Sequence, residues 1–117
     1  MTKLNIKAII ELTDEKLVEE TSATIEKGII TYQENNGTYV YLDINRHELV
    51  RENNDMLMKY VFIENEETKG KIFVKELNQE IELEIKTTKI EKEDDKYKVE
   101  YIVGNDTFTY EVKYSEV

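Results

Sequence analysis

Short runs in which apolar and polar residues alternate cover this chain from one end to the other, and turn-forming clusters separate them about every 8–12 residues. The clearest of these breaks are Glu26-Lys27-Gly28, Asn35-Asn36-Gly37, Asn53-Asn54-Asp55, Lys69-Gly70 and Gly104-Asn105-Asp106. Glycine and asparagine tolerate the positive φ that a tight reversal between antiparallel strands requires. The pattern therefore predicts an all-β domain built from consecutive hairpins.

Ten segments fit a strand. They lie at residues 4–12, 17–25, 29–33, 39–44, 49–51, 56–63, 71–76, 81–85, 97–103 and 108–114. Because nearly every connection is short, strands that are neighbours in sequence should pair as an antiparallel meander. A sheet this long leaves two adhesive edges unless it closes, so we expect a single β-barrel domain of about eight to ten strands over residues 1–117.

The pattern allows more than one interpretation for two segments. Residues 10–27 could form a helix instead, because good helix formers occur there: Glu15, Lys16, Glu19 and Glu20. Four later residues favour a strand, which we prefer: Thr21, Ser22, Thr24 and Ile25. Residues 56–63 are apolar on both alternating faces, so this strand should be the most buried one unless its second face is an interface. The residues expected inside the barrel with it are Met58, Tyr60, Phe62, Leu83 and Ile85.

The overall charge narrows the range of partners. The formal net charge is −10, so nucleic acid and anionic membranes would repel the chain. The absence of cysteine rules out disulfides and thiolate chemistry, and no continuous apolar segment marks a leader at the N-terminus. We therefore expect a cytoplasmic protein.

Catalytic signatures are missing. His47 is the single histidine, so a Ser-His-Asp arrangement or a multi-histidine metal site cannot form within one chain. It stands at an expected turn and is interpreted as a solvated residue. No glycine-rich phosphate loop or nucleophile elbow occurs. We therefore expect no enzyme, no metal and no cofactor.

Arg51 is the residue with the clearest chemistry. It shares strand parity with Leu49, so it should point into the barrel or its rim. A buried guanidinium must be paired, which leaves two interpretations. The preferred one is an ion pair with an inward carboxylate, and the other is an anchor for an anionic ligand. Tyrosines at inward parity, Tyr60, Tyr97, Tyr101 and Tyr110, should pack in the core or line a cavity.

Local patterns between residues 28 and 101 resemble a known family. In order they are Gly28 with Tyr32, Val40-Leu42-Ile44 in alternation, Leu49-Val50-Arg51, Met56-Leu57-Met58 leading to Tyr60 and Phe62, Glu82-Leu83-Glu84-Ile85 ending in Thr87, and Lys96-Tyr97-Lys98-Val99-Glu100-Tyr101. This stretch is similar to the YwiB-like proteins, an uncharacterised bacterial family of calycin-like β-barrels. The chain departs from the family at Asn53-Asn54 and Asn78-Gln79, where glycine is usual. The resemblance implies a lipocalin-like barrel and no established activity.

Two functions remain open. The first is a barrel that holds a small ligand, for which an anion is one candidate, with Arg51, Tyr60, Thr87 and Tyr101 as candidate binding residues. The second is a non-enzymatic interaction module or homodimer with a packed core, which would use outer residues such as Tyr39 and Tyr41. A hydrolase is the least favoured interpretation. The interior decides between the first two: a cavity favours ligand binding and a solid core favours association.

Overall fold

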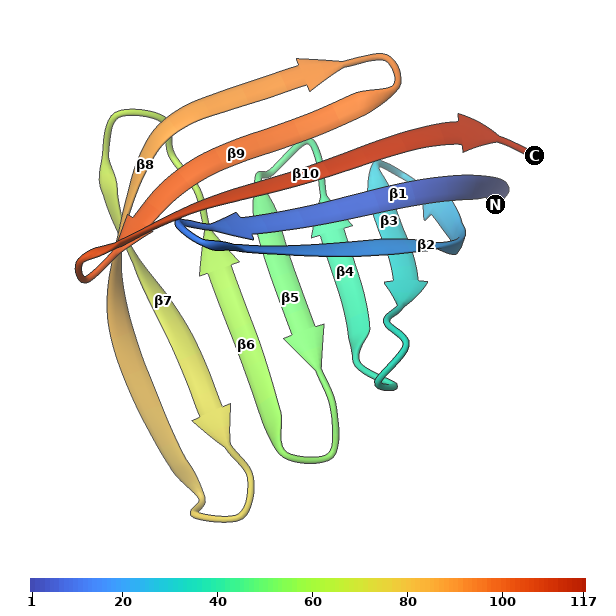
Figure 1. Ribbon diagram of the computed structural model, residues 1–117. Helices are drawn as coiled ribbons and strands as arrows, with labels where there is room; N and C mark the ends of the chain where they lie inside the picture. Colours follow the sequence, from blue (N-terminus) through green and yellow to red (C-terminus); the bar gives the residue numbers. More distant parts are fainter.

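Ten antiparallel strands and no helix make up the computed structural model, which describes all residues from 1 to 117 (Figure 1). The strands are β1 (Thr2–Leu12), β2 (Glu15–Glu26), β3 (Ile29–Gln33), β4 (Tyr39–Asp43), β5 (Glu48–Glu52), β6 (Met56–Val61), β7 (Glu67–Val74), β8 (Gln79–Glu93), β9 (Lys96–Val103) and β10 (Asp106–Glu116). Each strand pairs with the next in sequence, and β10 pairs with β1 to close the barrel. The predicted all-β meander barrel is confirmed.

The two ends of the chain meet at the closing pair. Leu4 of β1 lies opposite Glu116 of β10, and the amide of Val117 donates a hydrogen bond to the carbonyl oxygen of Lys3 at 3.1 Å. The closed ladder leaves no free edge along most of the sheet, as the sequence pattern predicts.

β2 shows why the helical interpretation of residues 10–27 is wrong. Every residue from Glu15 to Ile25 has a partner on β1, and Ala23 is buried in the same core as Leu4 and Ile6 of β1. At its end, Lys27 and Gly28 have φ values of 52° and 79°, which are typical of a two-residue hairpin turn. The cross-strand partners therefore override the local preference for helix over residues 15–20.

Lys69-Gly70 is not a turn, contrary to the prediction. Both residues lie inside β7, and Gly70 is paired with Leu83 of β8. A Cβ at Gly70 would come within 2.6 Å of a methyl carbon of Ile85 and 2.8 Å of the ring of Tyr60, so this glycine permits close packing across the core. The chain instead reverses just before β7, where Asn65 has a φ of 64°.

Residues 56–63 are not the most buried segment. Met58, Tyr60 and Phe62 are buried as predicted, but Leu57 is 37 % exposed and Ile63 is 46 % exposed. The barrel wall is one sheet thick and nothing covers its outer face, so a strand can bury only every second residue. β9 is more buried, because its inward tyrosines and valine fill the centre of the core.

The strand pairing of β8 accounts for a second difference between the expected and the observed core. It pairs with β7 up to Lys86 and with β9 only from Ile85 onward, and a bulge at Thr87/Lys89 separates the two halves. Ile85 is fully buried at the junction, whereas Leu83 lies on the half that has one neighbour and is half-buried. Leu83 therefore packs at the margin of the core rather than inside it.

Candidate functional site

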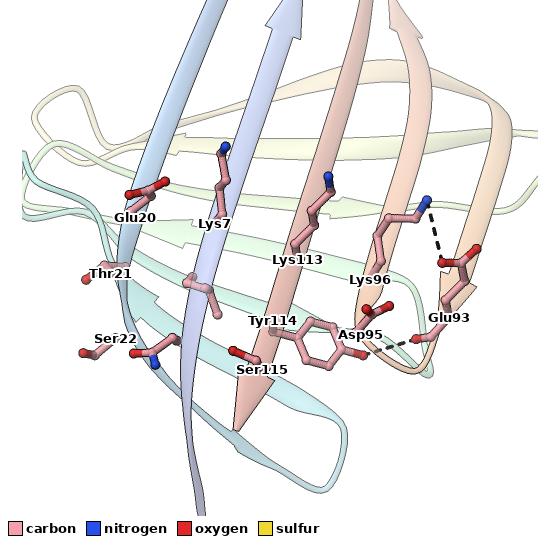
Figure 2. Close-up of a pocket in the computed structure, with 12 residues that line it drawn as sticks. Lys7, Glu20, Thr21, Ser22, Glu93, Asp95, Lys96, Lys113, Tyr114 and Ser115 are labelled. Carbon is pink, nitrogen blue, oxygen red and sulfur yellow. Dashed lines mark hydrogen bonds and ion pairs between the residues drawn. The ribbon is translucent and has the colours of Figure 1, made fainter. Parts of the chain in front are cut away.

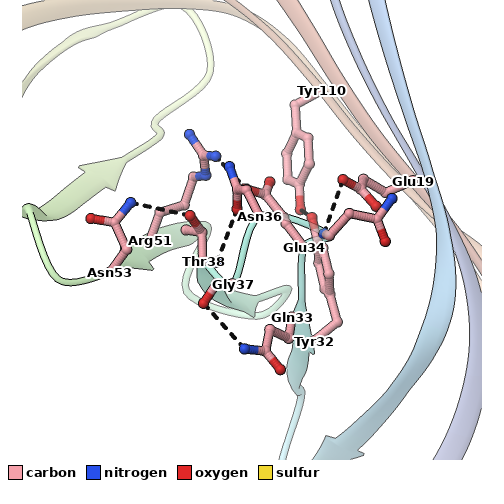
Figure 3. A network of polar contacts seen from close by, with 11 residues as sticks. Glu19, Tyr32, Gln33, Glu34, Asn36, Gly37, Thr38, Arg51, Asn53 and Tyr110 are labelled. Atoms are coloured by element: carbon pink, nitrogen blue, oxygen red, sulfur yellow. Dashed lines mark hydrogen bonds and ion pairs between the residues drawn. The ribbon is translucent and has the colours of Figure 1, made fainter.

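Arg51 lies at the end of the barrel where the β3–β4 and β5–β6 turns are located. It alternates with the buried Leu49 on β5, so its side chain is directed inward as predicted. Its guanidinium donates a hydrogen bond to a carboxylate oxygen of Glu34 at 2.5 Å (Figure 3). The side chain of Glu34 is only 8 % exposed and that of Arg51 is 24 % exposed. The pair is thus a largely desolvated ion pair.

Glu34 is the functional residue that the sequence reasoning missed. It follows the buried Ile30 and Tyr32 at the same two-residue spacing, and this parity was the available signal. The turn after β3 fixes its position, because the Glu34 amide donates to the Thr38 carbonyl oxygen at 2.8 Å. The Thr38 hydroxyl in turn accepts a hydrogen bond from the side-chain amide of Asn53 at 3.1 Å. The carboxylate is therefore held in place before any ligand arrives.

A cavity of about 160 Å³ lies beside this ion pair. Apart from Arg51 and Glu34, its walls are ten hydrophobic or aromatic side chains: Ile10, Tyr32, Val40, Leu49, Met58, Tyr60, Tyr101, Val103, Phe108 and Tyr110. Its size is comparable with the roughly 150 Å³ apolar cavity that can hold a benzene molecule. The barrel interior at this end is therefore not solidly packed.

Some hydrogen-bond donors around the cavity have no acceptor within the chain. The Arg51 Nε–H is buried and has no partner. The hydroxyls of Tyr60 and Tyr101 have no hydrogen bond within the chain, while those of Tyr32 and Tyr110 bond to each other at 2.7 Å. An unpaired buried donor costs about 1–3 kcal/mol, so the site is set to receive an acceptor.

Three of the four candidate binding residues meet at this cavity. Arg51, Tyr60 and Tyr101 line it together. Thr87 is fully buried and its hydroxyl also lacks a partner, but it is not part of the cavity wall. It lies at the bulge of β8 opposite Tyr101, where its backbone bonds to residues of the β6–β7 turn.

The tyrosines of this site stay protonated at neutral pH. Burial raises the pKa of Tyr32 to about 12, and the negative charge of Glu34 adds to the shift. Burial also raises the pKa of Tyr60, Tyr101 and Tyr110, and the positive charge of Arg51 opposes the shift in each case without reversing it. The hydroxyls therefore act as donors rather than as anionic bases.

This burial predicts a loss of stability at alkaline pH. The pKa of Tyr32 is about 12 in the folded chain against an ordinary value of 10.0, so the unfolded state releases its proton first as the pH rises. The stabilisation is complete below about pH 10 and is lost between about pH 10 and 12, with about 3 kcal/mol from Tyr32 alone. Urea unfolding from pH 8 to 12 measures it. Tyr32→Phe should flatten the decline, and an unchanged slope in that variant would contradict the assignment.

His47 lies at the opposite end of the barrel, and its surroundings there differ from the solvated position predicted from the sequence. Its ring is half-buried rather than solvated, and Nδ1 lies 2.9 Å from the hydroxyl oxygen of Tyr97, with the two rings stacked. His47 has a φ of 57°, and this turn conformation places the imidazole at the barrel end that Tyr97 fills. Burial raises the pKa of Tyr97, so its hydroxyl stays protonated at neutral pH and is able to share a hydrogen bond with the imidazole.

No cluster of three or more His, Cys, Asp or Glu side chains is placed to hold a metal ion. None of the segments is a helix with the length and apolar character needed to traverse a membrane. The site offers an apolar cavity, an ion pair and free hydrogen-bond donors.

Comparison with known proteins identifies one solved structure of the same architecture. No family model matches the chain, and no curated protein matches it in sequence. The crystal structure of the ywiB protein from Bacillus subtilis is similar with a TM-score of 0.63, over 98 % of this chain and 90 % of that one. The chain has a YwiB-like fold. The sequence identity is 17 %, so the likeness concerns the fold alone.

Proposed function

We propose that the barrel binds one small organic ligand in the cavity beside Arg51, with an apolar body and an acceptor group such as a carboxylate. The observation that carries this proposal is the buried Arg51 Nε–H, which has no partner and borders an apolar cavity. Binding pockets commonly combine apolar walls with a few polar groups that fix the orientation of the ligand.

The unpaired hydrogen-bond donors, rather than the net charge of the site, favour a carboxylate. Glu34 bonds to one nitrogen of the guanidinium, and this leaves Nε unpartnered. The hydroxyls of Tyr60 and Tyr101 add two further donors on the same cavity. An anionic oxygen satisfies such donors more strongly than a neutral one, because charge-assisted hydrogen bonds are about twice as strong. The cavity volume sets the body of the ligand at about one aromatic ring.

Titration with benzoate tests the proposal, with benzamide and benzyl alcohol as neutral analogues of the same size. We expect benzoate to shift the amide resonances of the cavity residues saturably and to bind at least about tenfold more tightly than either analogue. Tyr60→Phe and Tyr101→Phe should each weaken binding by about 3- to 10-fold, since each removes one hydrogen bond.

Tyr41→Phe is the matched control, because Tyr41 lies on the outer face of β4 and lacks contact with the cavity. It should leave the affinity for benzoate unchanged. Resonance shifts that are absent from the cavity residues for benzoate, and for aliphatic carboxylates of similar size, would refute the proposal.

We make two further proposals, which concern the family of the chain and the kind of protein it is. We infer membership of the YwiB-like, calycin-like barrel proteins, which the fold likeness and the sequence patterns between residues 28 and 101 support. We further propose a cytoplasmic binding protein without catalytic activity, because the chain has no cysteine and a single histidine. A net charge of −10 argues against nucleic acid and anionic membranes as partners.

Self-association is the second candidate function. Tyr39, Tyr41 and Leu57 are exposed on the outer faces of β4 and β6, and Leu57 is paired with Phe73 of β7. Glu52 of β5 lies between Tyr39 and Leu57, and exposed apolar side chains around a polar residue are a candidate contact surface. Sedimentation velocity at micromolar concentration distinguishes a monomer from a homodimer.

A further inference from the structure

β2 has a free edge over part of its length. Residues 23–26 are paired with β3, but residues 15–22 are paired with β1 on one side only. The amide of Asn35 donates a hydrogen bond to the side chain of Glu19 at 3.3 Å, and this contact leaves the main chain of the edge without a partner. A strand edge of this kind presents unpaired N–H and C=O groups with which another strand can pair.

The main-chain groups of Lys16, Val18 and Glu20 face the free side of β2. Glu26 and Ile29 flank the two-residue turn between β2 and β3, so they form a hydrogen-bonded pair. Along an antiparallel strand, the N–H and C=O groups of successive residues point alternately to one side and to the other. Every second residue before Glu26 therefore points to the same side as Glu26, which beyond the end of β3 is the free side.

The side chains of this segment combine exposed apolar residues with charges of both signs. Leu17 is 64 % exposed and Val18 is 45 % exposed. Lys16 and Glu20 lie two residues before and after Val18, so all three share the outer face of the strand, while Ala23 on the other face is buried. The charges thus stand at equal distances from Val18 and are opposite in sign.

This arrangement is complementary to itself. When two copies pair antiparallel about a two-fold axis at Val18, each Val18 lies opposite the other, and Lys16 of each copy lies opposite Glu20 of the other. Moving the axis by one residue in either direction places Glu19 opposite a glutamate of the second copy. Like charges opposite each other are destabilising, so the register centred on Val18 is favoured.

The strand next to the edge continues the same alternation of charge. Lys16 lies opposite Glu11 of β1, with 3.7 Å between the charged groups, and Glu20 lies beside Lys7 of β1 on the outer face (Figure 2). In the two-fold pairing, each row across four strands is therefore Glu11, Lys16, Glu20 and Lys7, with alternating sign. Opposite charges directly across adjacent strands stabilise a sheet.

The other free edge of the barrel does not suit a second copy. Residues 79–84 of β8 are paired with β7 alone. Glu80, Glu82 and Glu84 alternate with Ile81 and Leu83 along this edge and share one face. Any two-fold antiparallel pairing of this edge places carboxylates opposite carboxylates, which is unfavourable. Charged side chains are a common protection of strand edges, and β2 lacks this protection at Leu17 and Val18.

We propose that a second copy of this chain binds to the free edge of β2, and that residues 16–20 of the two copies pair antiparallel about Val18. The resulting dimer joins the two barrel walls into one continuous sheet. It uses neither the internal cavity nor the exposed face of Tyr39, Tyr41 and Leu57. A single pair of short strands buries less than the roughly 1,200 Å² of a stable interface, so we expect a weak dimer that forms reversibly.

Sedimentation equilibrium at protein concentrations up to about 1 mM tests the proposal. We expect the average mass of the wild type to rise with concentration from that of a monomer toward that of a dimer. Lys16→Glu and Glu20→Lys each place like charges opposite each other at two positions of the dimer, so each should weaken association at least about tenfold. Mixed in equal amounts, the two variants should form a heterodimer, because both positions then hold opposite charges. This recovery also shows that both variants are folded.

Tyr39→Ser/Tyr41→Ser is the matched control, because both residues lie on the outer face of β4 and away from the free edge of β2. It should associate like the wild type, and a loss of association in this variant would place the contact on β4 and overturn the proposal. A wild type that stays monomeric at about 1 mM would also overturn it. So would single charge variants that associate like the wild type, or a mixture of the two that associates no more than either one alone.

Discussion

Replacing Arg51 by methionine is expected to lower the free energy of unfolding by about 3 kcal/mol. The substitution leaves the carboxylate of Glu34 at the barrel end without the guanidinium that bonds to it at 2.5 Å. Breaking a buried ion pair from one side costs about 3–5 kcal/mol, and the partial exposure of Arg51 places the effect at the lower end. Urea unfolding at pH 7 measures the change.

The Glu34→Gln/Arg51→Met double variant is the control for this result. It removes both charges while retaining much of the volume, so it should recover most of the stability that the single variant loses. A single-variant loss below about 0.5 kcal/mol, with no recovery in the double variant, would show that the pair behaves like an ordinary surface salt bridge.

Phe62→Ala should lower the free energy of unfolding by about 3–5 kcal/mol, because it truncates one of the largest fully buried side chains of the barrel. Phe62 is 1 % exposed, and its ring packs against Tyr101 at a centroid distance of 5.0 Å and edge-on to Tyr60 at 6.4 Å. Truncation removes these aromatic contacts and opens a cavity that the surrounding sheet cannot collapse to fill. Equilibrium unfolding in urea reports the difference.

Leu83→Ala is the matched comparison for the same experiment. Leu83 lies on the half of β8 that has only β7 as a neighbour and is half-buried, so its truncation should cost about 1–2 kcal/mol, below the range for buried leucines. Equal losses at Phe62 and Leu83 would mean that the core continues along β8 beyond the bulge.

The strands were predictable because a barrel wall one sheet thick enforces a two-residue period. Alternation alone assigns the inward positions of Met58, Tyr60 and Phe62, and the parity of Leu49 assigns that of Arg51. The same argument, extended two residues beyond Tyr32, finds Glu34. The strong turn signal at residues 35–37 makes Glu34 look like part of the turn. Its inward position in the alternation of β3 is therefore easily overlooked.

Other features depend on contacts between strands that are distant in the chain. Gly70 looks like a turn residue in isolation, and only the positions of Ile85 and Tyr60 on other strands show that it is needed for packing. The His47 contact with Tyr97 joins residues 50 positions apart. The cavity depends in the same way on how side chains from most of the strands fill a shared space, which alternation cannot predict.

The closing pair of the barrel has a consequence for how the chain reaches its fold. Nine of the ten strand pairings join neighbours in sequence, so each can form as a hairpin with a small loss of loop entropy. The pairing of β1 with β10 joins Leu4 to Glu116 and must close a loop of nearly the whole chain. We therefore expect the hairpins to form independently of one another, and the pairing of β1 with β10 to be the slowest step of folding because it closes the longest loop.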